Sequence, residues 1–212
     1  MRPPDSWKSA RLTLAIALVT ALAWVIVALL RLDAWAASAG GFIAAGVSAE
    51  TPLEGAPFWL RPLTATLVHF NWIHLGFNLL ILVFCGRPTE TVLGPVAVAF
   101  LYLVGAYAAA AAQYLIDPNE IVPMIGASGA ISAVLGAYAM LFGKNKVKVA
   151  NPVVALWLNA LWLMAAWVGL QLVVGFTFAS GGIDVAIAAH IGGFLAGILL
   201  AYPLLLFRYR KA

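Results

Sequence analysis

Long apolar runs separated by short polar connections dominate the chain. A helix needs about 20 apolar residues to cross a bilayer, and six runs approach that length. They lie near Leu12–Leu30, Val68–Cys85, Val96–Ile116, Ile125–Phe142, Val153–Val174 and Val185–Phe207. The pattern predicts an all-α membrane protein in which residues 1–212 form one domain of six transmembrane helices.

The composition supports a membrane protein. Of the 212 residues, 64% are hydrophobic and 9% are charged, and the mean hydropathy is +1.00. So few charges could not cover the surface of a soluble domain. The net charge of +4 does not indicate nucleic-acid binding, because no basic stripe is interleaved with aromatic residues. The single cysteine, Cys85, excludes an intramolecular disulfide, and we interpret it as a small buried hydrophobe.

Basic residues predict the orientation of the helices, because Lys and Arg accumulate in cytoplasmic connections. With the N-terminus inside, only Arg31 and Arg61 of the 12 Lys and Arg residues fall on the outer side. We therefore expect both termini to be cytoplasmic. The basic run from Lys144 to Lys148 is interpreted as a topology anchor. A cleaved signal peptide is the alternative for the first run, but that run is longer than a typical signal core.

The first outer connection, from Arg31 to about Leu67, is long and contains several aromatic residues. Because aromatic residues favour the membrane interface, we expect part of it to lie along or within the outer leaflet. Arg61 is expected to anchor this connection to backbone carbonyls.

Polar residues are concentrated in the second, fourth and sixth runs, which all begin on the outer side. They are His69, Asn71, His74 and Asn78 in the second run, Ser128 in the fourth and His190 in the sixth. Polar groups in a membrane are costly and usually functional. Their similar depth predicts a shared, water-accessible outer cavity.

Ser128 and His190 form the candidate catalytic pair. A serine needs a base to attack an amide, and His190 is the only ionisable group within the fourth or sixth run. No membrane-embedded Asp or Glu is placed to orient His190, so we predict a Ser–His dyad. The backbone N–H of Ser128, at a helix start, would stabilise a developing oxyanion.

Small residues would allow the fourth and sixth helices to approach closely. His190, Gly193 and Gly197 share one helix face, because they are spaced i, i+3 and i+7. Ser128, Ala133 and Gly136 make a comparable stripe, with Gly129 beside it. Gly126 and Gly129 would also leave room for a bound backbone. Ordinary packing without chemistry explains the glycines equally well, so they do not decide the function alone.

His74 and Asn78 are spaced i, i+4 and share a helix face. We interpret them as donors that support Ser128 N–H in an oxyanion hole, and the alternative is a pair of interhelical hydrogen bonds. His69 is expected to point elsewhere and to be structural. Glu90, placed just past the second run, is interpreted as a structural contact at the cytoplasmic end.

We expect no metal or cofactor, because no His-Glu-x-x-His run exists and bis-histidine haem ligation would leave Ser128 and Asn78 unexplained.

Taken together, these residues resemble the rhomboid family of intramembrane serine proteases. The similarity runs from about Trp59 to Tyr202 and rests on three motifs. They are His69-Phe70-Asn71-Trp72-Ile73-His74-Leu75-Gly76-Phe77-Asn78, Gly126-Ala127-Ser128-Gly129 and Ala189-His190-Ile191-Gly192-Gly193-Phe194-Leu195-Ala196-Gly197. The resemblance implies catalytic roles for Ser128 and His190 and an oxyanion-supporting role for His74 and Asn78. Glu90 matches a glutamate that the family often has after its second helix.

The sequence departs from the family's pattern at two positions. Many members have Trp-Arg in the outer connection, whereas here Leu60 precedes Arg61. Many also have an aromatic residue four positions after the serine, which stacks on the catalytic histidine, and here that residue is Ser132. A less firmly held His190 is the expected consequence.

The resemblance implies a six-helix rhomboid-like protease of a prokaryotic plasma membrane, multi-pass in the bilayer. Its substrates would be transmembrane proteins with small residues at the cut and a helix that unwinds easily. The implied gate is the fifth helix with the connection from Phe176 to Asp184, where Gly175, Gly181 and Gly182 allow movement. The alternative is a non-catalytic rhomboid-like binder of membrane proteins. A small-solute transporter is disfavoured, since no inverted repeat is evident.

Overall fold

The computed structural model describes residues 10–49, 53–143, 149, 151–179 and 186–210, and the described residues are almost entirely helical. The long helices are α1 (Arg11–Leu29), α4 (Trp72–Leu93), α5 (Pro95–Ile116), α6 (Ser128–Phe142), α7 (Pro152–Ala179) and α8 (Ile187–Tyr209). Shorter helices lie between α1 and α4, namely α2 (Asp33–Gly40), η1 (Ala44–Val47), η2 (Phe58–Leu60), α3 (Arg61–Thr64) and η3 (Ala65–Leu67). The predicted all-α fold is confirmed.

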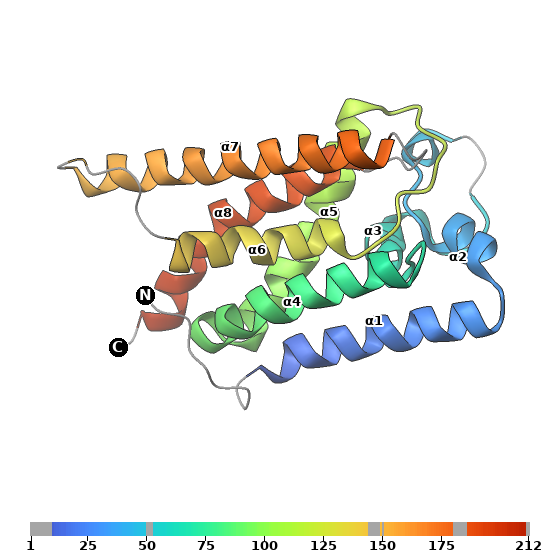
Figure 1. The fold of residues 1–212 in the computed structure, drawn as a ribbon, viewed down its shortest axis with the longest axis horizontal. Helices are drawn as coiled ribbons and strands as arrows, with labels where there is room; N and C mark the ends of the chain where they lie inside the picture. The colour runs from blue at the N-terminus through green and yellow to red at the C-terminus, as the bar shows by residue number, and fades with distance from the viewer. Residues whose placement is uncertain (1–9, 50–52, 144–148, 150, 180–185, 211–212) are drawn as a thin grey trace.

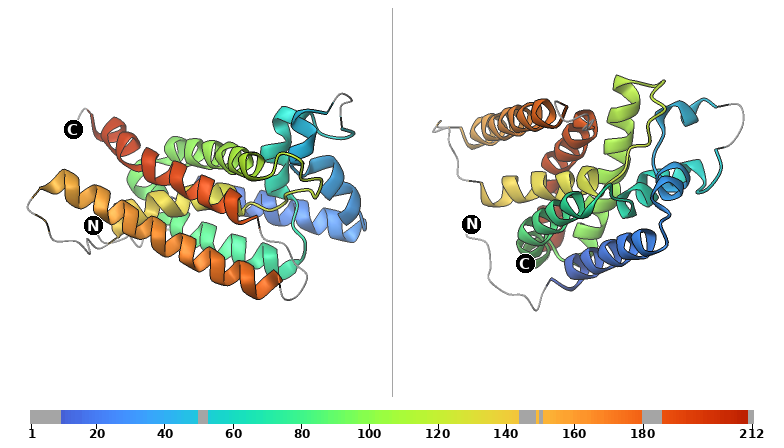
Figure 2. Two further views of the ribbon diagram at one scale, coloured as in Figure 1. Left: turned by 90° about the horizontal axis from the view of Figure 1, so that it is seen from above. Right: turned by 45° about the vertical axis from the view of Figure 1, so that its right-hand side comes forward.

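The bundle is built around α6, which packs against α4, α5 and α8. Helix α1 packs on α4 at one side of the bundle, and α7 packs chiefly on α8 at the opposite side (Figure 1). The two further views show the same order, with α6 inside the bundle and α7 at its edge (Figure 2). Residues on α6 are therefore surrounded by three other helices.

The long apolar helices make the chain a multi-pass membrane protein. Four described helices, α1, α5, α7 and α8, are long and apolar enough to cross a bilayer by themselves. Helix α4 qualifies together with the segment Phe58–Leu67 before it, at a bend of 93°. Helix α6 has only 15 residues, which corresponds to about 22 Å at 1.5 Å per residue. The predicted count of six spans therefore stays a prediction.

The start of α6 explains its shortness. We expected the fourth span to begin near Ile125, but Gly126 has φ +111°, a left-handed conformation that ends regular helix geometry and favours glycine. The Gly126 N–H donates instead to the Ala65 carbonyl oxygen at 2.9 Å. Helix α6 begins only at Ser128, so the serine stands where a loop turns into a buried helix.

Helices α6 and α8 are in backbone contact. A Cβ added at Gly193 would overlap the Gly129 carbonyl oxygen, and one added at Gly197 would overlap the Ala133 carbonyl oxygen. A Cβ at Gly136 would likewise overlap the carbonyl oxygen of Phe194. Small residues therefore allow the close approach that the sequence pattern predicted.

Helix α4 extends further than expected. We placed the end of the second span at Cys85 and Glu90 just past it, but α4 continues to Leu93 and contains Glu90. The Glu90 carboxylate is 2% exposed and accepts hydrogen bonds from Leu12 N, Thr13 N and Thr13 Oγ1 at 2.6 to 2.9 Å. Two of these donors are backbone N–H groups of the first turn of α1, which lack intrahelical acceptors, and the third is the Thr13 hydroxyl. The structural role expected of Glu90 is confirmed.

Arg61 holds the outer connection together. Its guanidinium is fully buried and donates to four backbone carbonyls, those of Ser38, Gly41, Glu54 and Ala56, at 2.7 to 3.2 Å. Five N–H donors in a rigid plane suit this role. The anchoring predicted for Arg61 is confirmed, although Leu60 rather than tryptophan precedes it.

The proposed gate falls largely outside the described residues. Helix α7 continues to Ala179, so the residues from Phe176 that were expected to lie in a connection are helical. Residues 180–185, which include Gly181 and Gly182, lie outside the described ranges.

Candidate active site

The structure brings Ser128 and His190 together. His190 Nε2 lies 2.7 Å from Ser128 Oγ, although 62 residues separate them in sequence. Ser128 is the first residue of α6 and His190 the fourth of α8, and both side chains are half-buried. With its proton on Nδ1, the imidazole accepts a hydrogen bond from the serine hydroxyl through Nε2.

His74 lies beside this pair, across Gly126. A Cβ added at Gly126 would lie 2.7 Å from both Cε1 and Nε2 of His74 and 3.7 Å from Ser128 Oγ. The imidazole edge of His74 and the serine hydroxyl thus face the same point. Position 126 requires glycine for two independent reasons, the positive φ and the His74 ring.

Asn78 is buried one turn after His74 on α4. Its Nδ2 donates to the His74 carbonyl oxygen at 2.8 Å, and this bond fixes the orientation of the amide, because a carbonyl can only accept. One hydrogen of Nδ2 remains for another acceptor. Asn78 Oδ1 is buried, with no hydrogen-bond partner in the described part of the chain.

The expectation that His69 points away from His74 is wrong. The two rings pack at a centroid distance of 5.0 Å. The reason is that α4 begins only at Trp72, so residue 69 lies before the helix and does not follow its periodicity. His69 Nε2 accepts from the Ala127 N–H at 3.4 Å, which links the α4 entry to the loop before Ser128.

Ser132 lies one turn after Ser128 on α6. Its hydroxyl donates to the Ser128 carbonyl oxygen at 2.7 Å, a back-bond of the i−4 type. The side chain is buried where α6 meets Gly193.

The sequence pattern did not predict the roles of two residues near the site, Asn71, which it placed only among the polar residues of the second run, and Trp167. Asn71 caps α4 by accepting from His74 N at 2.8 Å, and a polar residue just before an apolar helical run is the signal that could have shown it. Trp167 on α7 donates from Nε1 to the His190 carbonyl oxygen at 3.4 Å. No sequence signal separates Trp167 from the other tryptophans of α7.

The glycines of the candidate site divide into two groups. Gly126 lies at the reacting groups, as described above. Gly129, Gly193 and Gly197 lie at contacts between helices. A Cβ at Gly129 would press on Ala109 of α5, and Gly193 and Gly197 of α8 face α6.

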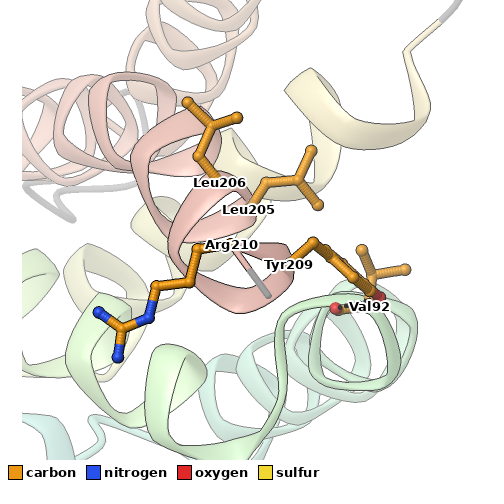
Figure 3. Close-up of a pocket in the computed structure, with 5 residues that line it drawn as sticks. All are labelled: Val92, Leu205, Leu206, Tyr209 and Arg210. Atoms are coloured by element: carbon orange, nitrogen blue, oxygen red, sulfur yellow. Dashed lines mark hydrogen bonds between the residues drawn. The ribbon is translucent and has the colours of Figure 1, made fainter. Parts of the chain in front are cut away.

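A groove at the far end of α8 offers no chemistry of this kind. It has a volume of about 400 Å³ and is lined by Val92, Leu205, Leu206, Tyr209 and Arg210 (Figure 3). The Tyr209 hydroxyl donates to the Val92 carbonyl oxygen at 3.1 Å. The groove contains no serine, cysteine or histidine, and it lies at the last turn of α8, whereas His190 lies at the first.

The geometry can carry out acyl transfer. A hydroxyl within hydrogen-bond distance of an imidazole is a nucleophile with its base. Ser128 also opens a helix, where the first N–H groups have no intrahelical acceptor and can donate to an oxyanion. His74 and Asn78 lie on the neighbouring helix α4, and the oxyanion-supporting role expected of them stays a prediction.

Known proteins resemble this chain over most of its length. Residues 57–207 match the family model described as the Rhomboid domain. The chain is 32% identical over 160 residues to Rhomboid-related protein 2 of Mus musculus, covering 72% of this chain and 52% of that protein. It is 30% identical over 152 residues to Rhomboid protease GlpG of Pectobacterium atrosepticum, covering 71% and 51%. It is 29% identical over 160 residues to Rhomboid protease GluP of Bacillus subtilis, and this match covers 73% of this chain and 28% of that protein.

The chain spans about half or less of the length of these relatives. The match to the family model nevertheless covers most of the chain and includes all three motifs on which the resemblance rested. The chain belongs to the rhomboid family.

Proposed function

We propose that the protein is an intramembrane serine endopeptidase that cleaves transmembrane helices of membrane-protein substrates near their outer end. The observation that carries the proposal is the 2.7 Å contact between Ser128 Oγ and His190 Nε2. The names of two relatives, Rhomboid protease GlpG and Rhomboid protease GluP, support the same reaction class.

In the proposed reaction, Ser128 Oγ attacks the scissile carbonyl carbon while His190 Nε2 takes the hydroxyl proton. The tetrahedral oxyanion accepts hydrogen bonds from Ser128 N–H, from the His74 ring and from the remaining hydrogen of Asn78 Nδ2. His190 then returns the proton to the leaving amine, and an acyl-enzyme forms on Ser128. Water, with His190 again as base, releases the second product.

A dyad is proposed because α6 and α8 contain no Asp or Glu. The arrangement therefore differs from the Ser-His-Asp triad of soluble proteases, in which a carboxylate orients the imidazole. No metal or cofactor is needed for these steps, and that expectation stays a prediction.

The fold offers a reason why the site would act on membrane helices. Helix α6, about 22 Å long, is shorter than a hydrocarbon core of about 30 Å. Irregular backbone, such as the loop before Ser128, is tolerated at membrane depth only within protein or beside water. We infer that this loop admits water to the dyad. A substrate helix hides its carbonyls in backbone hydrogen bonds, so a helix that unwinds easily is the expected substrate.

Covalent labelling tests the proposal. We expect a fluorophosphonate to form one adduct with the purified protein, on Ser128, and Ser128→Ala and His190→Ala to form none. Intact-mass measurement shows the adduct, and peptide mapping locates it. Ser132→Ala is the matched control, because its hydroxyl is one turn away on the same helix and bonds only to a backbone carbonyl. An adduct that persists in Ser128→Ala would contradict the assignment.

A non-catalytic binder of membrane proteins is the second candidate. Such a binder has no need of the Ser128–His190 contact. If the protein binds a model helix but neither cleaves it nor is labelled by the fluorophosphonate, it would be assigned to this class.

Localisation in a prokaryotic plasma membrane stays a prediction, because the relatives come from bacteria, a plant and a mouse.

A further inference from the structure

We propose that Trp167 on α7 is a positioning residue for His190 and makes the reactivity of the dyad depend on the placement of α7. The inference rests on the proposed function. It concerns how the base is held, which neither the family match nor the dyad itself determines.

Trp167 contacts α8 at two points one turn apart. Its Nε1 donates to the His190 carbonyl oxygen at 3.4 Å, and its ring stacks on Phe194 with centroids 5.3 Å apart and planes 16° apart. Residues 190 and 194 are spaced i, i+4 and lie on one face of α8. A rigid indole that touches both residues restricts rotation and sliding of the first turns of α8.

Helices α5 and α6 also pack on α8. Glycine contacts on α6 fix the distance between the helices at Gly193 and Gly197. At position 132 of α6, the side chain is a serine whose hydroxyl donates to a carbonyl oxygen of its own helix. Trp167 supplies an aromatic support from α7, through the backbone of His190.

The contact also joins the dyad to the most peripheral helix. Within the described residues α7 packs chiefly on α8 (Figure 1). The cluster that α7 shares with α8 consists of Ala160, Phe194 and Ile198. Leu163, Met164 and Trp167 of α7 pack against it, as do Leu135, Ala139 and Met140 of α6. Trp167 is the member of this cluster that hydrogen-bonds to His190. A shift of α7 therefore acts on the backbone of the base directly.

The test compares Trp167→Ala and Trp167→Phe with Leu163→Ala in the full-length protein. Leu163 is the matched control, because it lies one turn away on the same face of α7 and packs on the same cluster. The measurements are the rate constant of fluorophosphonate labelling, kcat and KM for a model transmembrane substrate, and thermal stability in detergent. The phosphonate is small, so its rate does not depend on admitting a substrate helix.

We expect Trp167→Ala to lower the labelling rate and kcat by about tenfold, which is less than the roughly 10²-fold cost of a full 1 Å misplacement of a catalytic group. KM should stay at the parental value. Trp167→Phe keeps a ring on Phe194 but lacks the N–H, and its labelling rate should lie between those of the parent and Trp167→Ala. Leu163→Ala should label at the parental rate even where its thermal stability is lower.

Three results would overturn the inference: parental labelling by Trp167→Ala, an equal loss in Leu163→Ala, or a raised KM with unchanged kcat. Should Trp167→Ala fail to fold, Trp167→Phe decides, and parental labelling by that variant counts against the inference. If the parent protein itself is not labelled, the proposed function fails, and this outcome is distinct from all of the others.

Discussion

At the scale of single residues, the site depends on where polar groups find partners in an apolar molecule. Ser128 and His190 satisfy one another at 2.7 Å, and His69 accepts from the loop that precedes the serine. Asn78 Oδ1 and His69 Nδ1 are exceptions, because both atoms are buried without a hydrogen-bond partner in the described structure. A buried amide that is only partly satisfied is costly, and such costs are commonly retained where function requires the group.

Removing the proposed oxyanion donors should separate turnover from folding. Loss of one such donor typically costs about 10²–10³ in rate, whereas an interhelical hydrogen bond in a membrane is worth only about 0.6 kcal/mol on average. We therefore expect His74→Ala and Asn78→Ala to keep near-parental thermal stability in detergent. Cleavage of a model helix should fall steeply, yet remain above that of Ser128→Ala, because Ser128 N–H is still present.

Asn71→Ala is a suitable control for these variants. It removes the α4 cap beside the same histidine without removing a proposed donor, and its effect should appear as lost stability. Equal cleavage by the parent and both donor variants would count against the oxyanion role, as would activity lost only through unfolding.

At the scale of elements, the contact between α6 and α8 determines whether the dyad can form. Its closeness depends on positions where any side chain would meet a backbone carbonyl, notably Gly193 and Gly197. Helices α6 and α8 therefore lie close enough for the hydrogen bond between Ser128 and His190 in their first turns.

Gly197→Ala should destabilise the protein and reduce labelling of Ser128. The added methyl group would overlap the Ala133 carbonyl oxygen, and overpacking of this kind typically costs about 1–3 kcal/mol. Gly76→Ala on α4 is the control, because nothing lies within 4 Å of a Cβ there and alanine is the better helix former. Thermal unfolding in detergent compares the two, and a Gly197→Ala variant as stable as Gly76→Ala would show that the helices can separate freely.

The sequence indicated the main elements and the dyad because both depend on strong patterns. Ser128 and His190 were recognisable as polar residues among small ones, and the glycine spacing predicted a close helix pair. The orientation of His69 was misjudged, because the true start of α4 depends on the Asn71 cap. The shortness of α6 depends on the positive φ of Gly126, which no apolar run reveals. Trp167 was not distinguishable, because its role depends on the rotation of α7 against α8.

At the scale of the whole molecule, both ends of the described chain lie at the same end of the bundle. The first turn of α1 is bonded to Glu90, and Tyr209, the last residue of α8, is bonded to the carbonyl oxygen of Val92. The candidate dyad is at the other end of α8. This arrangement agrees with an even number of crossings and with a site near one membrane face.

Reporter fusions test the predicted topology. A fusion at the C-terminus should report the cytoplasm, and one inserted within Asp117–Pro123, before the dyad, should report the opposite side. The expectation follows from the distribution of Lys and Arg. If both fusions report the same side, the six-span arrangement is contradicted. A reporter placed between Lys144 and Lys148 is an internal control, and it should report the same side as the C-terminal fusion.

The bond from Glu90 to the first turn of α1 also bears on the order of assembly. Helix α1 is synthesised before α4, yet the N–H groups of Leu12 and Thr13 receive their acceptor from a residue 77 to 78 positions later. During synthesis these groups must be satisfied by water or by lipid headgroups until α4 has been made. The first turn of α1 is thus completed only after α4 has been made, and the docking of α1 follows the synthesis of α4.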